Sequence, residues 1–175
     1  MSESMTVAEV LEGLRRERIR LLAAVDALGP RAETVWVTEP DGWTAKDVLG
    51  HLIHYNGQIA FGLGAERDDD RAGPPPYVIG VTERLSGQEW NDRAVAYWRG
   101  FTLDEVRAEF VTNADMIEAR VATLSDGDLA APSTDRVPWD HPGRKLADFI
   151  GHDTFLIEWP AHAEQIERAA SRESL

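Results

Sequence analysis

Three side chains in two distant segments have the types and spacing of metal ligands. Glu158 and His162 lie four residues apart, so a helix would place them on one face. His51 lies far earlier in the chain, within the apolar stripe of another predicted helix. If the two helices face one core, the three side chains converge. Imidazole and carboxylate ligands suit Zn, Ni, Fe or Mn, and three protein ligands leave coordination positions open for water or substrate.

A structural role is the alternative for the same residues. A histidine at the edge of an apolar stripe is more often a hydrogen-bonded core residue than a ligand, and Glu-x-x-x-His pairs also arise by chance. Pro160 lies between Glu158 and His162. A proline inside a helix removes a hydrogen bond and kinks or breaks the helix, which either re-aims the two side chains or spoils their shared face. His152, six residues before Glu158, is a reserve candidate on another side of the helix.

Four long amphipathic helices are predicted to position these residues. Apolar residues recur at steps of three and four, and Thr6, Thr44 and Thr102 each precede an acidic residue by three positions, which is typical of helix caps. The predicted ranges are 6–28, 44 to about 62 or 64, 102 to about 124, and about 144–170, with a shorter helix over about 86–100.

No repeat and no convincing set of strands interrupts this pattern. The sequence therefore predicts an all-α four-helix bundle with long connecting loops, in a single domain over 1–175 with its core at about 6–168. Residues 64–80 carry Asp68-Asp69-Asp70 and Pro74-Pro75-Pro76, and we expect them to form a long mobile loop rather than a lid.

The composition excludes several classes of function. The formal net charge is -13 and no basic patch is present, which argues against nucleic acid and anionic membrane surfaces as partners. The chain has no cysteine, so any thiol in its chemistry must come from a cofactor or substrate. It has no Gly-rich phosphate loop and no Gly-x-Ser-x-Gly elbow, so neither nucleotide binding nor serine hydrolysis is supported. No signal peptide and no membrane-spanning run is apparent, which predicts a cytoplasmic protein.

Three segments carry a resemblance to a known family. They are Gly42-Trp43-Thr44-Ala45-Lys46-Asp47-Val48-Leu49-Gly50-His51, Glu89-Trp90-Asn91, and the stretch from Asp153-Thr154 to His162-Ala163-Glu164-Gln165-Ile166. Together they resemble the DinB-like superfamily of four-helix bundles, which includes DinB/YfiT-type proteins and the N-terminal domain of mycothiol-dependent maleylpyruvate isomerase. The resemblance extends from about Val7 to Ile166 and implies the same bundle fold.

The resemblance also implies a ligand set. Many DinB-type proteins hold a metal with one histidine on the second helix and a His-x-x-x-His pair on the last. His51 matches the first histidine and His162 matches the last. Glu158 stands at the middle position, where the maleylpyruvate isomerase branch is similar in having glutamate. A site of two histidines and one carboxylate is chemically sound for Zn or Ni.

Two functions are therefore expected from the sequence. The first is a divalent-metal-dependent enzyme of thiol S-transferase or hydrolase type that acts on a small molecule, with a low-molecular-weight thiol as cofactor. The alternative is a non-catalytic DinB-like bundle that has lost its metal and binds a small ligand or a protein partner. A homodimer is expected by family analogy. No catalytic or cofactor-binding residue is assigned beyond the three metal ligands, and fold analogy does not identify the substrate.

Overall fold

The computed structural model describes residues 5–38, 42–64, 87–137 and 142–172. Within these ranges the chain is all-α, as predicted, and its only β pairings are the isolated bridges Trp36–Thr44 and Pro132–Lys145. Most of the predicted 64–80 loop lies outside the described residues. The helices are α1 Val7–Leu28, η1 Gly29–Glu33, α2 Ala45–Gly62, α3 Gly87–Trp98, α4 Leu103–Val121, α5 Asp126–Ala130, η3 Ser133–Asp135, α6 Leu146–His152 and α7 Glu158–Arg172.

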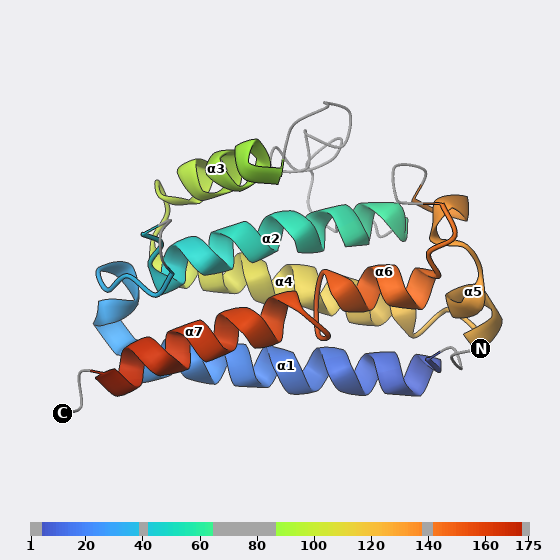
Figure 1. Ribbon diagram of the computed structural model, residues 1–175, viewed down its shortest axis with the longest axis horizontal. Helices are drawn as coiled ribbons and strands as arrows, with labels where there is room; N and C mark the ends of the chain where they lie inside the picture. Colours follow the sequence, from blue (N-terminus) through green and yellow to red (C-terminus); the bar gives the residue numbers. More distant parts are fainter. Residues whose placement is uncertain (1–4, 39–41, 65–86, 138–141, 173–175) are drawn as a thin grey trace.

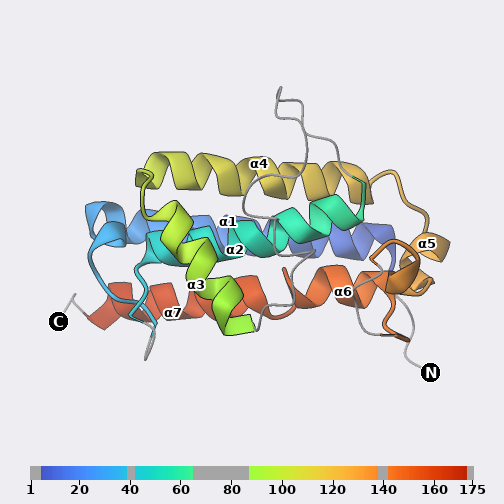
Figure 2. The same cartoon turned by 90° about the horizontal axis from the view of Figure 1, so that it is seen from above.

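The long helices run side by side as a bundle with four positions (Figures 1 and 2). Helices α1, α2 and α4 each fill one position, and α6 and α7 follow one another along the fourth. Helix α1 packs against α4 and α7, and α2 packs against the same two helices. Helix α3 lies outside the bundle and crosses α2. No helix in the described part of the chain is long and apolar enough to cross a membrane.

Capping boxes begin three of the bundle helices, as the sequence predicts. In each box the threonine side chain accepts a backbone N–H three residues later, and the acidic side chain of that residue accepts the N–H of the threonine. The pairs are Thr6 with Glu9, Thr44 with Asp47, and Thr102 with Glu105. Because these bonds satisfy donors that a helix leaves free, each box fixes where its helix begins.

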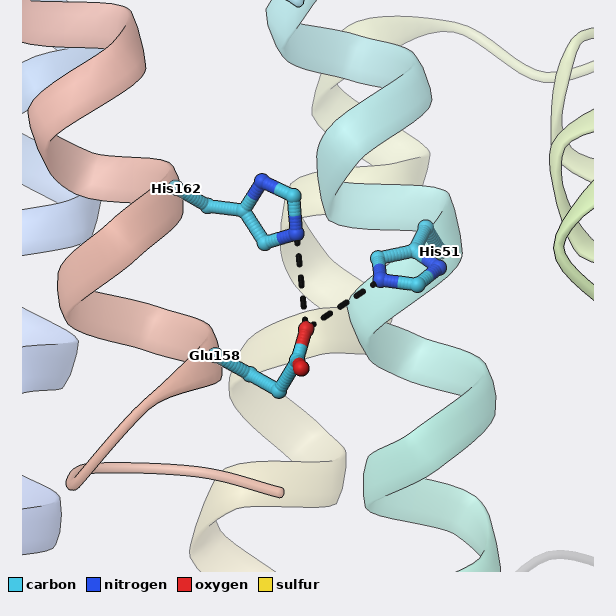
Figure 3. A group of neighbouring side chains, drawn as sticks. All are labelled: His51, Glu158 and His162. Carbon is cyan, nitrogen blue, oxygen red and sulfur yellow. Dashed lines mark ion pairs between the residues drawn. The ribbon is translucent and has the colours of Figure 1, made fainter. Parts of the chain in front are cut away.

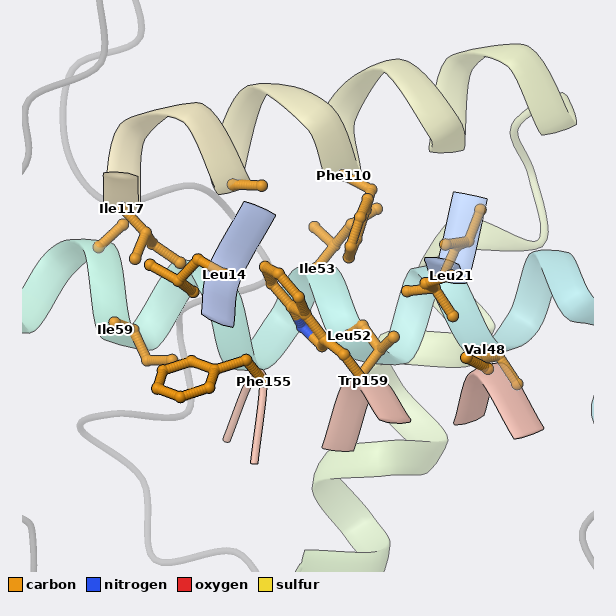
Figure 4. Packing of buried hydrophobic residues seen from close by; sticks show 14 of the residues in the cluster. Leu14, Leu21, Val48, Leu52, Ile53, Ile59, Phe110, Ile117, Phe155 and Trp159 are labelled. Carbon is orange, nitrogen blue, oxygen red and sulfur yellow. The ribbon is translucent and has the colours of Figure 1, made fainter. Parts of the chain in front are cut away.

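All four positions of the bundle contribute to one apolar core (Figure 4). Leu14 and Leu21 of α1, Ile53 of α2 and Phe110 of α4 are fully buried there. Trp159 of α7 is also fully buried: its ring centroid lies 5.4 Å from that of Phe110, and its Nε1–H donates to Asn56 Oδ1 at 3.3 Å. This anchor fixes the start of α7, and with it the neighbouring Glu158.

The single last helix predicted over about 144–170 is wrong. Helix α6 ends at His152, residues 153–157 form a turn, and α7 begins at Glu158. The N–H groups of Leu156 and Trp159 donate to the carbonyls of Gly151 and Thr154 at 2.8 and 2.9 Å, each reaching back five residues instead of four. Gly151 permits this path, because a Cβ there would lie 2.6 Å from Leu156 Cδ1.

The sequence predicts a kink or a break at Pro160, and the structure breaks the helix a few residues earlier, before Glu158. Pro160 is the third residue of α7, where a backbone N–H has no carbonyl partner within its own helix. Proline is tolerated in this first turn, so the turn from Glu158 to His162 stays helical. The two side chains therefore share one face of α7.

Candidate metal centre

His51 of α2 meets Glu158 and His162 of α7 between the two helices (Figure 3). The Nε2 atoms of His51 and His162 each lie 3.5 Å from the same atom, Oε2 of Glu158. One ligand atom from each of the three residues lies within 4.8 Å of the other two. The structure thus brings together the three residues that the sequence singles out, while metal binding itself stays a prediction.

Helix α2 presents His51 from a crowded, buried position. His51 is 4% exposed, and its ring centroid lies 5.0 Å from that of Trp43, 4.9 Å from that of Tyr55 and 5.1 Å from that of His162. The preceding residue is Gly50, where a Cβ would lie 2.7 Å from Trp98 Cβ. This glycine lets α3 approach α2 next to the site, so α3 helps to cover it.

Burial and charge set complementary protonation states in the cluster. Burial lowers the pKa of His51, an effect that Glu158 opposes and the neighbouring His162 reinforces. The imidazoles of His162 and His51, which face its carboxylate, hold the pKa of Glu158 well below its usual range, against the effect of burial. At neutral pH the cluster therefore contains a neutral His51 and an ionised Glu158, the forms that bind metal ions.

Tyr55 borders the cluster. The sequence indicates only that it lies on an apolar helical stripe. Tyr55 lies one turn after His51 on α2, and its hydroxyl donates to Asn91 Oδ1 of α3 at 3.3 Å. Burial raises the pKa of Tyr55 to about 12, and the negative charges of Glu158 and Asp153 act in the same direction. The phenol therefore keeps its proton at neutral pH and remains a hydrogen-bond donor. In the sequence, the spacing of four residues between His51 and Tyr55 already indicates that both side chains lie on one face of the helix.

The reserve candidate His152 does not join the cluster. It ends α6 with a half-exposed side chain, and its Nδ1 pairs with Asp153 Oδ1. Asp153, five residues before Glu158, is taken up by this pair. Burial raises the pKa of Asp153 although His152 opposes the shift. A different residue, Gln165, contacts a member of the cluster: its Oε1 lies 2.8 Å from His162 Nδ1. The sequence reading assigned it no role.

Comparison with solved structures supports the fold. A protein from Streptococcus pneumoniae superposes with a TM-score of 0.70 at 13% identity, covering 96% of this chain and 92% of the other. An uncharacterised protein from Clostridium difficile 630 superposes with a TM-score of 0.72 at 14% identity, covering 99% and 100%. At these identities the likeness establishes the fold alone. A search of curated protein sequences gave no match.

The family profile named DinB superfamily matches residues 13–153. The match spans most of the chain and includes His51, and it ends in the turn before Glu158 and His162. The resemblance seen in the sequence is confirmed at this level, and the chain belongs to the DinB superfamily.

Proposed function

We propose that His51, Glu158 and His162 bind a divalent metal ion, and that the protein is a metal-dependent enzyme of thiol S-transferase or hydrolase type acting on a small molecule. One observation carries the proposal: two imidazole Nε2 atoms face a single carboxylate oxygen at equal distances of 3.5 Å. Among the described residues, the ion-pair partners of Glu158 are these two imidazoles alone. The Glu158 side chain is partly buried, at 26% exposure, and lacks a permanently charged cation among these partners, so a metal ion would supply the missing charge.

The donor set fits such an ion. Zn bonds to imidazole nitrogen and carboxylate oxygen are about 2.0–2.2 Å long, so two ligand atoms on one tetrahedral ion lie about 3.4 Å apart. The observed separations of 3.5 Å from Glu158 Oε2 agree with that value. Two nitrogen ligands and one oxygen ligand also suit Ni, Fe or Mn, and the side chains alone do not select among these metals.

The chain's own residues define what chemistry the site supports. A bound divalent ion would act as a Lewis acid and lower the pKa of a thiol or water that reaches it. Trp43 and Tyr55 flank His51 and keep bulk water from that side, and the Tyr55 hydroxyl donates its proton to Asn91 of α3 next to the cluster. Since the chain has no cysteine, the sulfur of a thiol transfer must come from a small molecule. Cytoplasmic location and a homodimer stay predictions.

Metal content is the test. Protein purified without a polyhistidine tag is analysed by elemental mass spectrometry, before and after incubation with Zn, Ni, Fe or Mn. The wild type should carry close to one ion per chain, and Glu158→Ala and His162→Ala should lose it. His152→Ala is the matched control, because His152 is a half-exposed histidine outside the cluster. A wild type that takes up none of the four metals would overturn the proposal and favour the non-catalytic bundle.

The reaction class is tested on the same preparations. One assay supplies N-acetylcysteine and an activated aryl chloride: a sulfur–carbon bond forms, chloride leaves, and the thiol proton passes to solvent. A second assay supplies nitrophenyl esters, whose hydrolysis consumes one water. Activity that follows metal content across wild type, His152→Ala and Glu158→Ala supports an enzyme. Turnover that persists in metal-free Glu158→Ala would contradict a metal-dependent reaction.

A further inference from the structure

The two histidines of the cluster differ in what holds the far side of each ring. His162 Nδ1 lies 2.8 Å from Gln165 Oε1, on the next turn of α7. His51 Nδ1 is buried and meets no hydrogen-bond partner at standard geometry within the described part of the chain, although the Asn91 side chain of α3 interacts with the His51 ring and raises its pKa. Among the described residues, Nδ1 of His162 therefore has a close partner at 2.8 Å and Nδ1 of His51 has none at that distance.

We propose that Gln165 is a positioning residue that holds His162 in the tautomer with its proton on Nδ1. The bare Nε2 of His162 then faces Glu158 with its lone pair. The inference concerns the metal-free protein directly, and only its consequence for metal affinity rests on the proposed function.

The argument follows from donor and acceptor chemistry. A neutral imidazole carries one proton, and an amide oxygen only accepts hydrogen bonds, so with the Gln165 amide oriented with Oε1 toward His162, the Nδ1 atom carries that proton. The competing arrangement places the proton on Nε2, where it would be donated to the Glu158 carboxylate. Charge-assisted N–H···O bonds are typically about 2.7–2.9 Å long. The contact with Glu158 is 3.5 Å and the contact with Gln165 is 2.8 Å, which favours the proton on Nδ1.

The side chain of Gln165 also borders a recess in the surface. Its side chain is half-buried and lines a recess of about 210 Å³ together with Trp36, Val37 and Arg168. Arg168 is paired with Glu164, one turn earlier on α7, at 3.3 Å. Gln165 therefore lies between this recess and His162, and the three-residue spacing on α7 keeps it within reach of the ring.

The expected consequence is a better-prepared ligand. Partners that orient ligating histidines fix the tautomer and the ring angle, and losing one typically costs about 10–100-fold in metal affinity. With the proton on Nδ1, the Nε2 lone pair is available to a metal without a prior proton shift. Gln165 pairs with His162, so its contribution should fall on that ligand.

The test reads the proton directly. Long-range ¹H–¹⁵N NMR correlations assign the His162 tautomer in metal-free protein, at a pH where the ring is neutral. The variants are Gln165→Leu, which removes the acceptor, and Gln165→Glu, which keeps one. We expect the proton on Nδ1 in the wild type and in Gln165→Glu, and a shift of population to Nε2 in Gln165→Leu. A wild-type proton on Nε2 overturns the proposal, even if Gln165→Leu does not fold.

Zn²⁺ affinity, measured by competition with a chromogenic chelator, gives a second readout. Gln165→Leu should bind Zn²⁺ about 10–100-fold more weakly than wild type, and Gln165→Glu should remain within a few-fold. Unfolding of the metal-free variants checks that folding is unchanged. If the tautomer is as expected but no variant and no wild type binds metal, the proposed function fails and the positioning role stands. If the protein binds Zn²⁺ tightly but the His162 proton lies on Nε2, the positioning role fails and the metal site stands.

Discussion

Two carboxylates in this bundle are held between helices in different ways. Glu118 of α4 is 8% exposed, and it lies 2.9 Å from Arg15 Nε and 3.1 Å from Arg18 Nη1 of α1. Glu158 of α7 faces His51 of α2 and His162 on the next turn of its own helix. Both partners are imidazoles, and each Nε2 lies 3.5 Å from Glu158 Oε2. The contact between α1 and α4 is closed by cations that are always charged. The contact between α2 and α7 acquires a counter-charge only from a proton or a metal ion.

The difference separates structural from functional use of the same residue type. Arginine stays charged at every pH of interest, so the pairs with Glu118 need nothing from solution. Asp47 follows the same scheme, with Arg99 Nε and Nη2 at 3.1 Å from its two oxygens. Glu158 departs from it, because its two partners are ring nitrogens. The following experiments test whether this contrast holds.

Chelation should give the largest effect. A metal that binds only the folded state stabilises it by about 2.7 kcal/mol when its free concentration is a hundred times Kd. Urea unfolding in excess Zn²⁺ should therefore show a loss of that order when EDTA is added to the wild type. Glu118→Gln should keep the response to EDTA and Glu158→Gln should lose it. Equal responses in both variants would remove the contrast between the two carboxylates.

Neutralising Glu118 should give the next largest effect, this time without metal. Glu118→Gln removes the partner of Arg15 and Arg18, which retain side-chain exposures of 59% and 21%. Because both cations still reach water, we expect a loss of about 1–2 kcal/mol in the free energy of unfolding, less than for a fully buried pair. Urea unfolding in EDTA measures it. Glu158→Gln is the matched variant and should cost less, and a larger loss for Glu158→Gln would reverse our reading.

Loss of a helix cap should lower the free energy of unfolding by about 1 kcal/mol. The caps of α2 and α4 allow the two helices to be compared. Thr44→Ala removes the side chain that accepts the Asp47 N–H at the start of α2, which carries His51. Thr102→Ala does the same at the start of α4, which carries Glu118. Both should lower stability in EDTA by similar amounts. Only Thr44→Ala is expected to weaken Zn²⁺ binding measurably, and an equal weakening in both variants would argue against a local effect.

A pH series should show the smallest change. The pKa of His51 is lowered in the folded state, so the unfolded chain binds its proton first as pH falls below about 6.5. The pKa of Glu158 is also lowered, so its contribution is present above its ordinary pKa and is lost as pH falls below it. In EDTA, stability should therefore decline from about pH 7 downward, and His51→Leu should flatten the first part of the decline. An unchanged slope in that variant would contradict the assignment.

Features set by a few adjacent residues were the ones that the sequence predicted. The capping boxes at Thr6, Thr44 and Thr102 fixed three helix starts, because their hydrogen bonds join residues three positions apart. The shared face of Glu158 and His162 followed in the same way from their spacing. The placement of His51 beside them came from the family resemblance, and the structure brings the three together.

The break between α6 and α7 depends on residues that are distant in sequence. Phe155, Leu156 and Ile157 continue an apolar pattern that favours a helix, and the local signal against one, Pro160, lies after the point where α7 begins. Phe155 instead packs against α1 at Gly13, where a Cβ would lie 2.3 Å from Phe155 Cδ2. That pairing joins two ends of the chain, and neither segment alone reveals it. The position of Pro160 in a first turn follows from the same break.

The start of α7 also decides what the Glu158 side chain is free to do. An acidic residue in the first turn of a helix commonly folds back to accept that helix's unpaired N–H groups. Here the N–H groups of Trp159 and Ala161 donate to the carbonyls of Thr154 and Ile157, and Pro160 has no N–H to offer. These positions leave little to draw the carboxylate back onto its own backbone. Glu158 can instead extend toward His51. The break between α6 and α7 thereby keeps this carboxylate available as a ligand.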